Sequence, residues 1–365
     1  MRHRFHSICP YFAMFPESFA EHWIGRLTKS GDLVVDPFSG RGTAPFQALL
    51  MGRAAVGGDI NPVAYVLTKA KLRSPSLNRL LARIDELEEE FQVSDDTQWL
   101  LEDDENRQFF ELAFAPGTLR QLCFMRTSLQ WATDDTDAML AAVTLGCLHG
   151  AINAAANYLS NQMPRTISTK PNYSVKFWRE RALFPPPRDA FAVVRNRARF
   201  RYETKRPIRK GKVWLSDMRE LPGRVWPGLA RLLITSPPYL DTTSFEEDQW
   251  LRRWFLGGAP RPTRGVHSRD DRHYTRDTYW SMISDFWRVA GQLIAPGGSA
   301  VIRIAGKGLG TDELVSGLRG TSVCSTRNAE LVAWSVSEIA KRQTDAFRPG
   351  SLGLRTEVDC HFVLS

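Results

Sequence analysis

The sequence predicts an α/β fold in which a mostly parallel sheet is interrupted by a large helical insertion. Short apolar runs that end in polar turns lie near both ends of the chain, in residues 1–73 and 206–365. Residues 74–205 instead show mainly helical periodicity. Because a structureless loop of that length is uncommon in a compact fold, we expect the insertion to be a folded subdomain.

The first 73 residues contain two strand candidates, each followed by a helix. The apolar run Leu33–Asp36 leads through a glycine turn into a helix that begins near Thr43. Ala54–Asp59 is the second strand, and Asn61-Pro62 opens the next helix. An earlier helix begins near Pro16, since proline is well suited to the first position of a helix.

Two helices stand out in the insertion, and several strands follow it. Residues 77–91 have an apolar stripe at helical spacing, and residues 137–159 are rich in Ala, Leu and Val, which indicates a buried helix. The later strand candidates are Val213–Leu215, Leu232–Ile234, Ser299–Ile304, Leu331–Ile339 and Glu357–Leu364.

The charge of the chain is positive and uneven. The 48 Lys and Arg against 40 Asp and Glu give a net charge of +8. Residues 85–105 hold eleven of the acids and no base, so the remainder carries +19. A basic body suits a polyanionic partner such as nucleic acid, although the same charge also serves solubility.

Several classes of protein are disfavoured by composition. No run of about 18 apolar residues occurs, so no membrane span is expected, and the basic N-terminus lacks the apolar stretch of a secretory signal. The five cysteines are scattered without a C-x-x-C pair, which argues against a disulfide framework or a zinc site and favours the reducing cytoplasm. The seven histidines show no ligand spacing, so we expect them on the surface and expect no metal.

The first chemical motif is Asp36-Pro37-Phe38-Ser39-Gly40-Arg41-Gly42-Thr43. A strand, a glycine turn and a helix start allow backbone N–H groups to face a ligand, and the motif lacks the third glycine of the dinucleotide fingerprint. Asp59 ends the second strand, where its carboxylate can accept from two ribose hydroxyls. Asp217 ends the third strand and can accept from an adenine amino group. Both acids can instead cap the helical turns that follow them.

The second motif is Thr235-Ser236-Pro237-Pro238-Tyr239, after the fourth strand candidate. The two prolines fix φ and remove two donors, which orients nearby carbonyls and the Ser236 hydroxyl. Acceptors fixed against an exocyclic amine favour its pyramidal form, and Tyr239 offers a ring face to an extruded base. An ordinary Pro-Pro turn is the alternative for this stretch taken alone.

Together, the two motifs resemble those of S-adenosylmethionine-dependent DNA amino-methyltransferases of the restriction–modification type. The resemblance implies a Rossmann-like methyltransferase sheet and covers residues 5–72 and 206–305. It implies S-adenosyl-L-methionine as cofactor and direct methyl transfer by Ser236, Pro237, Pro238 and Tyr239. It places the cofactor against Phe15, Pro16, Asp36, Pro37, Phe38, Gly40, Gly42, Thr43, Asp59, Asn61, Asp217 and Met218.

The resemblance also implies double-stranded DNA as partner. Ser before Pro-Pro-Tyr is typical of N4-cytosine enzymes, so N4 of cytosine is favoured over N6 of adenine; an RNA amino-methyltransferase and a DNA-binding relic without activity are the other interpretations. The oligomeric state and the presence of a cognate restriction endonuclease encoded nearby are left open.

DNA contacts are expected mainly from the insertion, as the region that recognises the target. Nine Lys and Arg against one Glu lie in residues 195–212, a tract that is otherwise a solvated basic linker. Lys and Arg on phosphates give affinity without sequence information. The expected DNA-binding residues are Arg165, Lys170, Tyr173, Arg195, Arg197, Arg199, Arg201, Arg206, Arg209 and Lys210.

Overall fold

A computed structural model describes residues 2–11, 15–92, 97–150, 157–162, 170–241, 248–262, 273–338 and 356–365. The chain forms two compact units. The sheet unit comprises Ala13–Asn61, Arg209–Thr243 and His267–Ser365. The helical unit comprises Met1–Phe12, Pro62–Ile208 and Ser244–Val266. It therefore includes the whole of the predicted insertion 74–205 and further segments on both sides of it.

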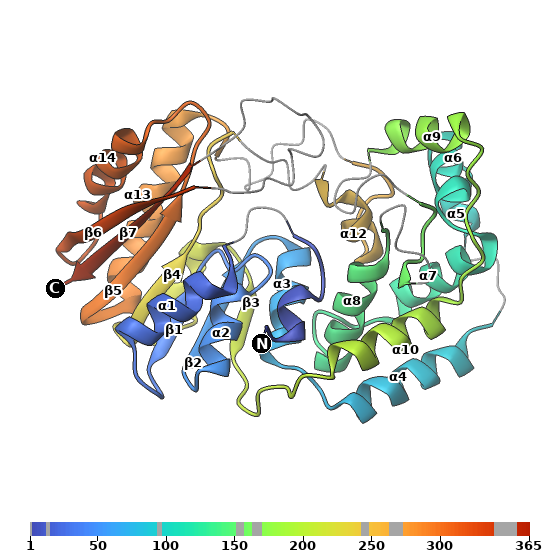
Figure 1. Cartoon of the computed structure of the whole chain (residues 1–365), viewed down its shortest axis with the longest axis horizontal. Coiled ribbons are helices and arrows are strands. Elements are labelled where there is room, and N and C mark those ends of the chain that lie inside the picture. The colour runs from blue at the N-terminus through green and yellow to red at the C-terminus, as the bar shows by residue number, and fades with distance from the viewer. Residues whose placement is uncertain are drawn as a thin grey trace. The chain divides into compact units, whose positions relative to one another are not determined.

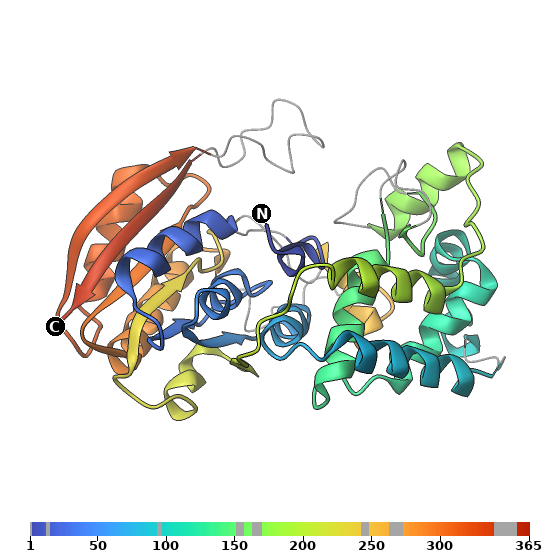
Figure 2. The same cartoon turned by 60° about the horizontal axis from the view of Figure 1, so that its bottom comes forward.

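The sheet unit is built on seven strands in the order β3-β2-β1-β4-β5-β7-β6 (Figure 1). The strands are β1 (Leu33–Asp36), β2 (Ala54–Asp59), β3 (Lys212–Leu215), β4 (Ala230–Thr235), β5 (Ile294–Ile304), β6 (Ala329–Glu338) and β7 (Thr356–Leu364). Strands β1 to β5 pair in parallel, whereas β7 is antiparallel to both β5 and β6. Figure 2 shows β6 and β7, in red, as two long strands at one side of this sheet.

This strand order confirms the predicted Rossmann-like, mostly parallel sheet. It is a doubly wound order in which the antiparallel β7 lies between β5 and β6. The order in which strands are added to the sheet changes at β1: β2 and β3 follow on one side of it, and β4 and β5 follow on the other. In such sheets the ligand site lies at the carboxyl ends of the strands on either side of that change of order.

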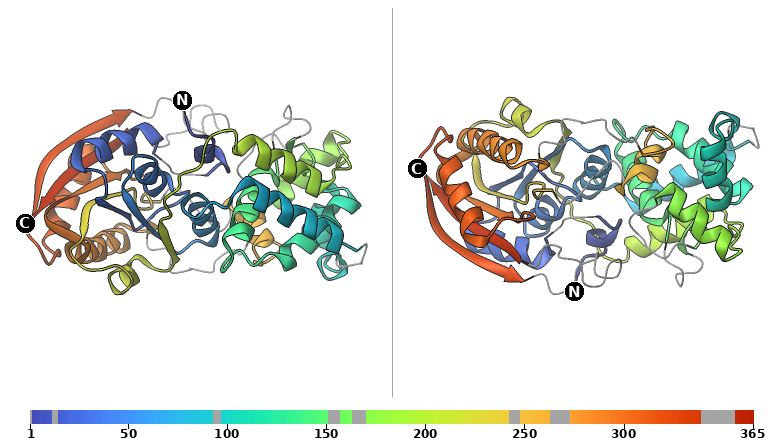
Figure 3. Two further views of the ribbon diagram at one scale, coloured as in Figure 1. Left: turned by 90° about the horizontal axis from the view of Figure 1, so that it is seen from below. Right: turned by 90° about the horizontal axis from the view of Figure 1, so that it is seen from above.

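Helices cover both faces of the sheet. Helices α1 (Glu17–Leu27) and α2 (Thr43–Leu50) form one layer, and α13 (Arg276–Leu293), α14 (Thr311–Ser322) and the 3-10 helix η3 (Met218–Gly223) form the other (Figure 3). The second layer buries one side of the strands: Val35 and Leu233 pack against α13, while their chain neighbours face the opposite layer. Because both faces are covered, β1 and β4 are almost wholly apolar until their final residues.

The helical unit has α8 (Asp135–Cys147) at its centre. Residues 136–147 of this helix are all buried, against α3 (Pro62–Leu72), α4 (Leu77–Glu90) and α10 (Ala190–Arg201). The other helices are η1 (Arg4–Ser7), α5 (Gln98–Leu101), α6 (Asp104–Ala113), α7 (Pro116–Ser128), α9 (Pro171–Glu180) and α12 (Trp250–Phe255). A helix buried on all sides is expected to be mostly apolar, and Thr144 is the one polar residue among positions 138–147 of α8.

Two expectations from the sequence were wrong. The helix predicted over residues 137–159 ends at Cys147, whose carbonyl accepts a hydrogen bond from Leu159 N–H at 2.9 Å. The histidines were expected on the surface, yet His6, His149 and His361 are buried. Burial lowers the pKa of His149 well below its ordinary value, and burial also lowers the pKa of His361.

Candidate active site and nucleic-acid contacts

The carboxyl ends of the neighbouring strands β1 and β4 bring the two sequence motifs together. The Thr235 hydroxyl, at the end of β4, donates a hydrogen bond of 2.6 Å to Asp36 Oδ1, at the end of β1. Phe38 N–H donates to the same oxygen at 3.2 Å. The parallel pairing of Val35 with Leu233 sets this register, so the first motif and the second lie side by side although 199 residues separate Asp36 from Thr235.

Asp36 has an unusual electrostatic environment. Its side chain is 1% exposed. Its pKa is raised to about 7: burial is the main cause, the hydrogen bonds from Thr235 and Phe38 oppose the change, and the negative charge of Asp59 adds to it. Functional sites commonly contain a titratable group whose pKa is shifted toward neutrality, as the pKa of Asp36 is here.

The glycine turn is fastened to β2. Gly40 N–H donates to Asp59 Oδ2 (2.8 Å), and Ser39 N–H donates to the Gly58 carbonyl (3.0 Å). Gly40 and Gly42 have φ of +50° and +75°, a region that residues with a Cβ enter only with strain. The turn therefore needs glycine for its path as well as for close approach to a ligand.

The carboxylates that end β2 and β3 have local partners. Asp59 Oδ1 accepts from Asn61 N–H at 2.9 Å, and Asp217 Oδ1 accepts from Arg219 N–H at 2.9 Å, which caps η3. The Arg219 guanidinium also contacts both oxygens of Asp217. The capping role considered for Asp217 is thus present, whereas Asp59 accepts from Asn61, the residue before α3.

The other predicted cofactor residues occupy the same unit. Phe15 is buried with its ring 5.0 Å from that of Phe19, and Pro16 is the N-cap of α1. Pro37 is buried, Phe38 packs toward Phe286, Thr43 begins α2, and Met218 lies in the core beneath α13. A buried polar atom lies next to this set. Ser216 Oγ, adjacent to Asp217, has no hydrogen-bond partner among the described residues.

That donor and acceptor set fits S-adenosylmethionine. Asp59 and Asp217 are acceptors suited to ribose hydroxyl and adenine amino groups, and the turn at Gly40 and Gly42 carries no Cβ that would fill the space beside it. The orphaned Ser216 hydroxyl is a further polar group that a nucleoside can satisfy.

The Ser236–Tyr239 turn follows β4 directly. Tyr239 is 5% exposed, and its hydroxyl donates to Glu357 Oε1 at 2.7 Å. Burial, followed by the Glu357 charge, raises the pKa of Tyr239 well above its ordinary value. Because the ring is buried, stacking of an extruded base on it would require a change of conformation around this turn.

A cluster of charged side chains next to Tyr239 was not predicted from the sequence. Arg303 of β5 pairs with Glu357 (3.2 Å) and Asp359 (2.6 Å) of β7, and its guanidinium lies 4.1 Å from the centre of the Phe19 ring. The only signal in the sequence is polar residues inside otherwise apolar strands, which does not reveal their partners.

The predicted DNA-binding residues on α10 are in several different environments. Arg195 pairs with Asp85 (2.7 Å) and Glu88 of α4. Arg197 lies over the rings of Tyr158 and Phe200, whereas Arg199 is exposed. Arg201 is 6% exposed and donates to Ser7 Oγ (2.7 Å), so it holds the N-terminal segment to α10.

The remaining predicted DNA-binding residues lie elsewhere. Arg206 donates to the Ser74 carbonyl, and Arg209 and Lys210 are exposed in the sheet unit, with Arg209 donating to the Gly52 carbonyl. Lys170 and Tyr173 are exposed at the start of α9. Arg165 lies outside the described residues.

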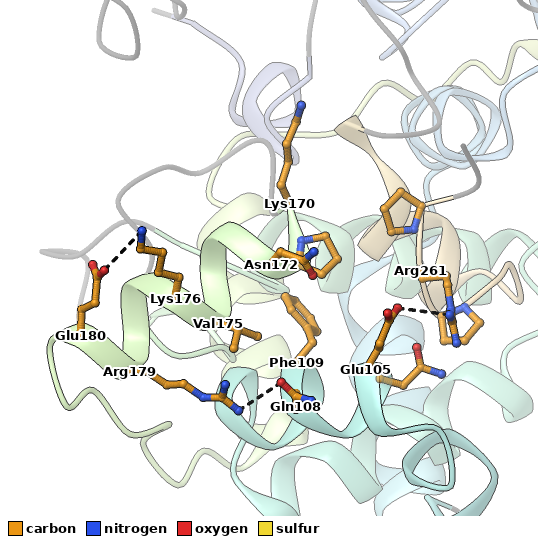
Figure 4. A pocket seen from close by; sticks show the side chains of 14 residues that line it. Glu105, Gln108, Phe109, Lys170, Asn172, Val175, Lys176, Arg179, Glu180 and Arg261 are labelled. Atoms are coloured by element: carbon orange, nitrogen blue, oxygen red, sulfur yellow. Dashed lines mark hydrogen bonds and ion pairs between the residues drawn. The ribbon is translucent and has the colours of Figure 1, made fainter. Parts of the chain in front are cut away.

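Lys170 borders a cavity of about 790 Å³ in the helical unit (Figure 4). Its walls are α6, α9 and the segment after α12, with Phe109 on the α6 side and Asn172 on the α9 side. Three pairs hold the rim: Arg179 with Gln108 (3.2 Å), Arg261 with Glu105 (3.3 Å) and Lys176 with Glu180 (3.6 Å). The cavity thus carries both signs of charge.

Neither a metal site nor a membrane span is found in the described part of the chain. No group of three or more His, Cys, Asp or Glu side chains in those residues converges as metal ligands would. Among the described helices, none has the length and hydropathy to cross a membrane.

Comparison with known proteins adds a family match at the N-terminal end. Residues 3–70 match the model of a DNA methylase family. The Type II methyltransferase M.MjaII of Methanocaldococcus jannaschii is 33% identical over 75 residues. That alignment covers 20% of this chain and spans only 14% of the length of the relative.

Solved structures with a similar arrangement include TrmN from Thermus thermophilus (TM-score 0.40, 10% identity, 99% of this chain and 52% of that one). An rRNA methylase from Streptococcus thermophilus has a TM-score of 0.32 at 7% identity and covers 97% of this chain and 98% of that chain. The antibiotic-resistance methyltransferase Kmr has a TM-score of 0.33 at 10% identity and covers 96% and 94%. The fold assignment above depends on strand order and register.

Proposed function

We propose that this protein transfers a methyl group from S-adenosylmethionine to the exocyclic amino group of a base in DNA, with N4 of cytosine favoured. The observation that carries the proposal is the row of polar groups at the ends of four adjacent strands. Asp217, Asp59, Asp36 and the Ser236 turn follow β3, β2, β1 and β4, which are neighbours in that order. The DNA methylase match of residues 3–70 supports the same activity.

In this proposal, the cofactor supplies an activated methyl group on a sulfonium, so the protein has mainly to bind and orient. Asp59 accepts from the ribose hydroxyls, and Asp217 accepts from the adenine amino group. The glycine turn admits the ligand closely because Gly40 and Gly42 carry no side chain. Asp36, at the start of the first motif, contributes a buried carboxyl group that accepts a hydrogen bond from Thr235 of the second motif.

On the acceptor side, Ser236 and the carbonyls of its turn accept hydrogen bonds from the amino group of the target base. Pro237 and Pro238 fix the backbone, so these acceptors are oriented before the base arrives. An amine held in this way has its lone pair directed away from the ring system and is a better nucleophile. Ser at the first position favours cytosine; N6-adenine and RNA amino-methylation are the alternatives that one experiment separates.

The test combines cofactor binding with product analysis. Purified protein should bind S-adenosylmethionine in calorimetry, and Asp59→Ala should weaken binding without lowering the melting temperature greatly. DNA from an expressing host should contain N4-methylcytosine at a short motif, absent with Ser236→Ala. Detection of N6-methyladenine instead would show that adenine is the target base. Methylated RNA with unmodified DNA would show that RNA is the substrate. Absence of cofactor binding by the wild-type protein would refute the proposal.

We further propose that the helical unit recognises the DNA target, with exposed Lys and Arg on phosphates. Substituting Lys170, Arg199 and Lys205, three exposed residues of this unit, by Ala together should lower the slope of log affinity against log salt by about 3, roughly one per lost contact. Arg195→Ala is the matched control, because its guanidinium is already paired with Asp85 and Glu88. An unchanged salt slope in the triple variant would place the DNA on another surface.

A further inference from the structure

The Ser236 and Tyr239 hydroxyls form a chain that ends on the Glu357 carboxylate. Tyr239 and Glu357 are 118 residues apart, and the Tyr239 hydroxyl lies 2.7 Å from Glu357 Oε1. The Ser236 side chain is hydrogen-bonded to the same Tyr239 hydroxyl. All three residues belong to the sheet unit. The chain therefore joins the turn after β4 to the beginning of β7.

The direction of these hydrogen bonds is determined by the charge at the end of the chain. An ionised carboxylate can only accept, so the single Tyr239 proton is donated to Glu357. The Tyr239 oxygen is then an acceptor toward Ser236, and the single Ser236 proton is donated to it. What Ser236 has left for any other group is its lone pairs.

Glu357 is held in place from the other side. Its Oε2 lies 3.2 Å from Arg303 Nη1, and Arg303 is itself fixed by Asp359, whose two oxygens accept from it at 2.6 and 2.7 Å. The Arg303 and Glu357 side chains are 8% and 14% exposed. A pair so little exposed to water keeps its geometry better than a surface pair does.

We infer that Glu357 is a positioning residue that acts through Tyr239 to keep the Ser236 oxygen a hydrogen-bond acceptor toward the substrate amine. This inference depends on the proposed amino-methyltransferase function. That chemistry requires acceptors against the amine hydrogens, whereas a Ser236 hydroxyl free to rotate would also populate donor orientations. Glu357 removes those orientations without touching the substrate.

Glu357→Gln tests the inference because it preserves shape and reverses the chain. The amide oxygen should face Arg303, which only donates, so the amide NH₂ faces Tyr239. Tyr239 must then accept, its proton turns to Ser236, and Ser236 becomes the donor toward the amine. We expect kcat to fall about tenfold to a hundredfold, the range for one lost hydrogen bond to a charged group, with S-adenosylmethionine affinity and KM for DNA nearly unchanged.

Tyr239→Phe supplies the discriminating background. It removes the hydroxyl link, so kcat should fall severalfold, and adding Glu357→Gln should then change kcat no further. Glu330→Gln, at an exposed position of the neighbouring β6, is the matched control and should behave as the wild type.

Each outcome bears on the inference. Wild-type kcat in Glu357→Gln would overturn it, and so would an equal loss in the Tyr239→Phe background, since that would show an effect that bypasses Tyr239. If Glu357→Gln does not fold, a wild-type kcat for Tyr239→Phe alone overturns it. Absence of methyl transfer by the wild-type protein would instead refute the proposed function itself.

Discussion

Asp36 provides the sharpest link between the structure and a measurable quantity. Its pKa is raised from 3.8 to about 7, chiefly by burial. Between these values the folded protein binds a proton that the unfolded chain has lost, so stability from this group is complete below pH 3.8 and is lost as pH rises to about 7. About three pKa units at 1.36 kcal/mol each give a loss of roughly 4 kcal/mol.

The perturbation is Asp36→Asn, which keeps the acceptor for Phe38 N–H and cannot ionise. The difference in unfolding free energy between the variant and the wild type should move in favour of the variant by roughly 4 kcal/mol from pH 4 to pH 8. Urea denaturation at intervals of half a pH unit, followed by tryptophan fluorescence, measures it. A difference that is constant with pH would refute the reasoning, because it would mean that Asp36 titrates alike in both states.

Thr235→Val gives an independent check on the same carboxyl group. The Thr235 hydroxyl donates to Asp36 at 2.6 Å and so favours the ionised form. Its loss should raise the pKa of Asp36 further and move the end of the pH window upward, as ¹³C NMR of the Asp36 carboxyl carbon would show. A downward movement would mean that the hydrogen bond has the opposite effect.

Three further predictions concern stability, each measured by chemical denaturation. Gly58→Ala should destabilise the sheet unit by about 1–3 kcal/mol, because the new Cβ would lie 2.9 Å from Leu221; no loss would mean that Leu221 moves freely. Arg303→Met should destabilise by about 3–5 kcal/mol, since it leaves the Asp359 carboxylate buried and unpaired; a stable variant would show that water reaches this group. Leu140→Ala, at a fully buried position of α8, should destabilise the helical unit by about 2–5 kcal/mol, and a smaller loss would indicate that the core closes around the gap.

Most of the sheet could be predicted because its signals are local. Residues 33–36 and 54–59 were predicted as strands with the bounds that β1 and β2 have. Apolar runs bounded by glycine and proline specify strands and turns through the conformations of a few neighbouring residues. The end of α8 was missed because the sequence stays rich in apolar residues beyond Cys147, and composition does not reveal that the Cys147 carbonyl accepts a hydrogen bond from the distant Leu159 N–H.

The basic tract on α10 shows the same limit. Nine basic residues lie in positions 195–212, four of them on α10. Composition could not separate Arg199, which is exposed, from Arg201, which is buried against Ser7, or from Arg195, which is paired with acids of α4. A side chain's partner depends on which helix lies opposite, and that is a property of the packed unit.

The sequence by itself determined the two turns and their residue types, because glycine and proline restrict the backbone wherever they occur. Only the tertiary structure decided which residues of those turns contact each other and which other side chains they contact. Parallel pairing of β1 with β4 places Thr235 on Asp36, and antiparallel pairing of β5 with β7 places Arg303 beside Glu357, which reaches Tyr239. These contacts join residues more than 50 positions apart, and sheet register fixes them.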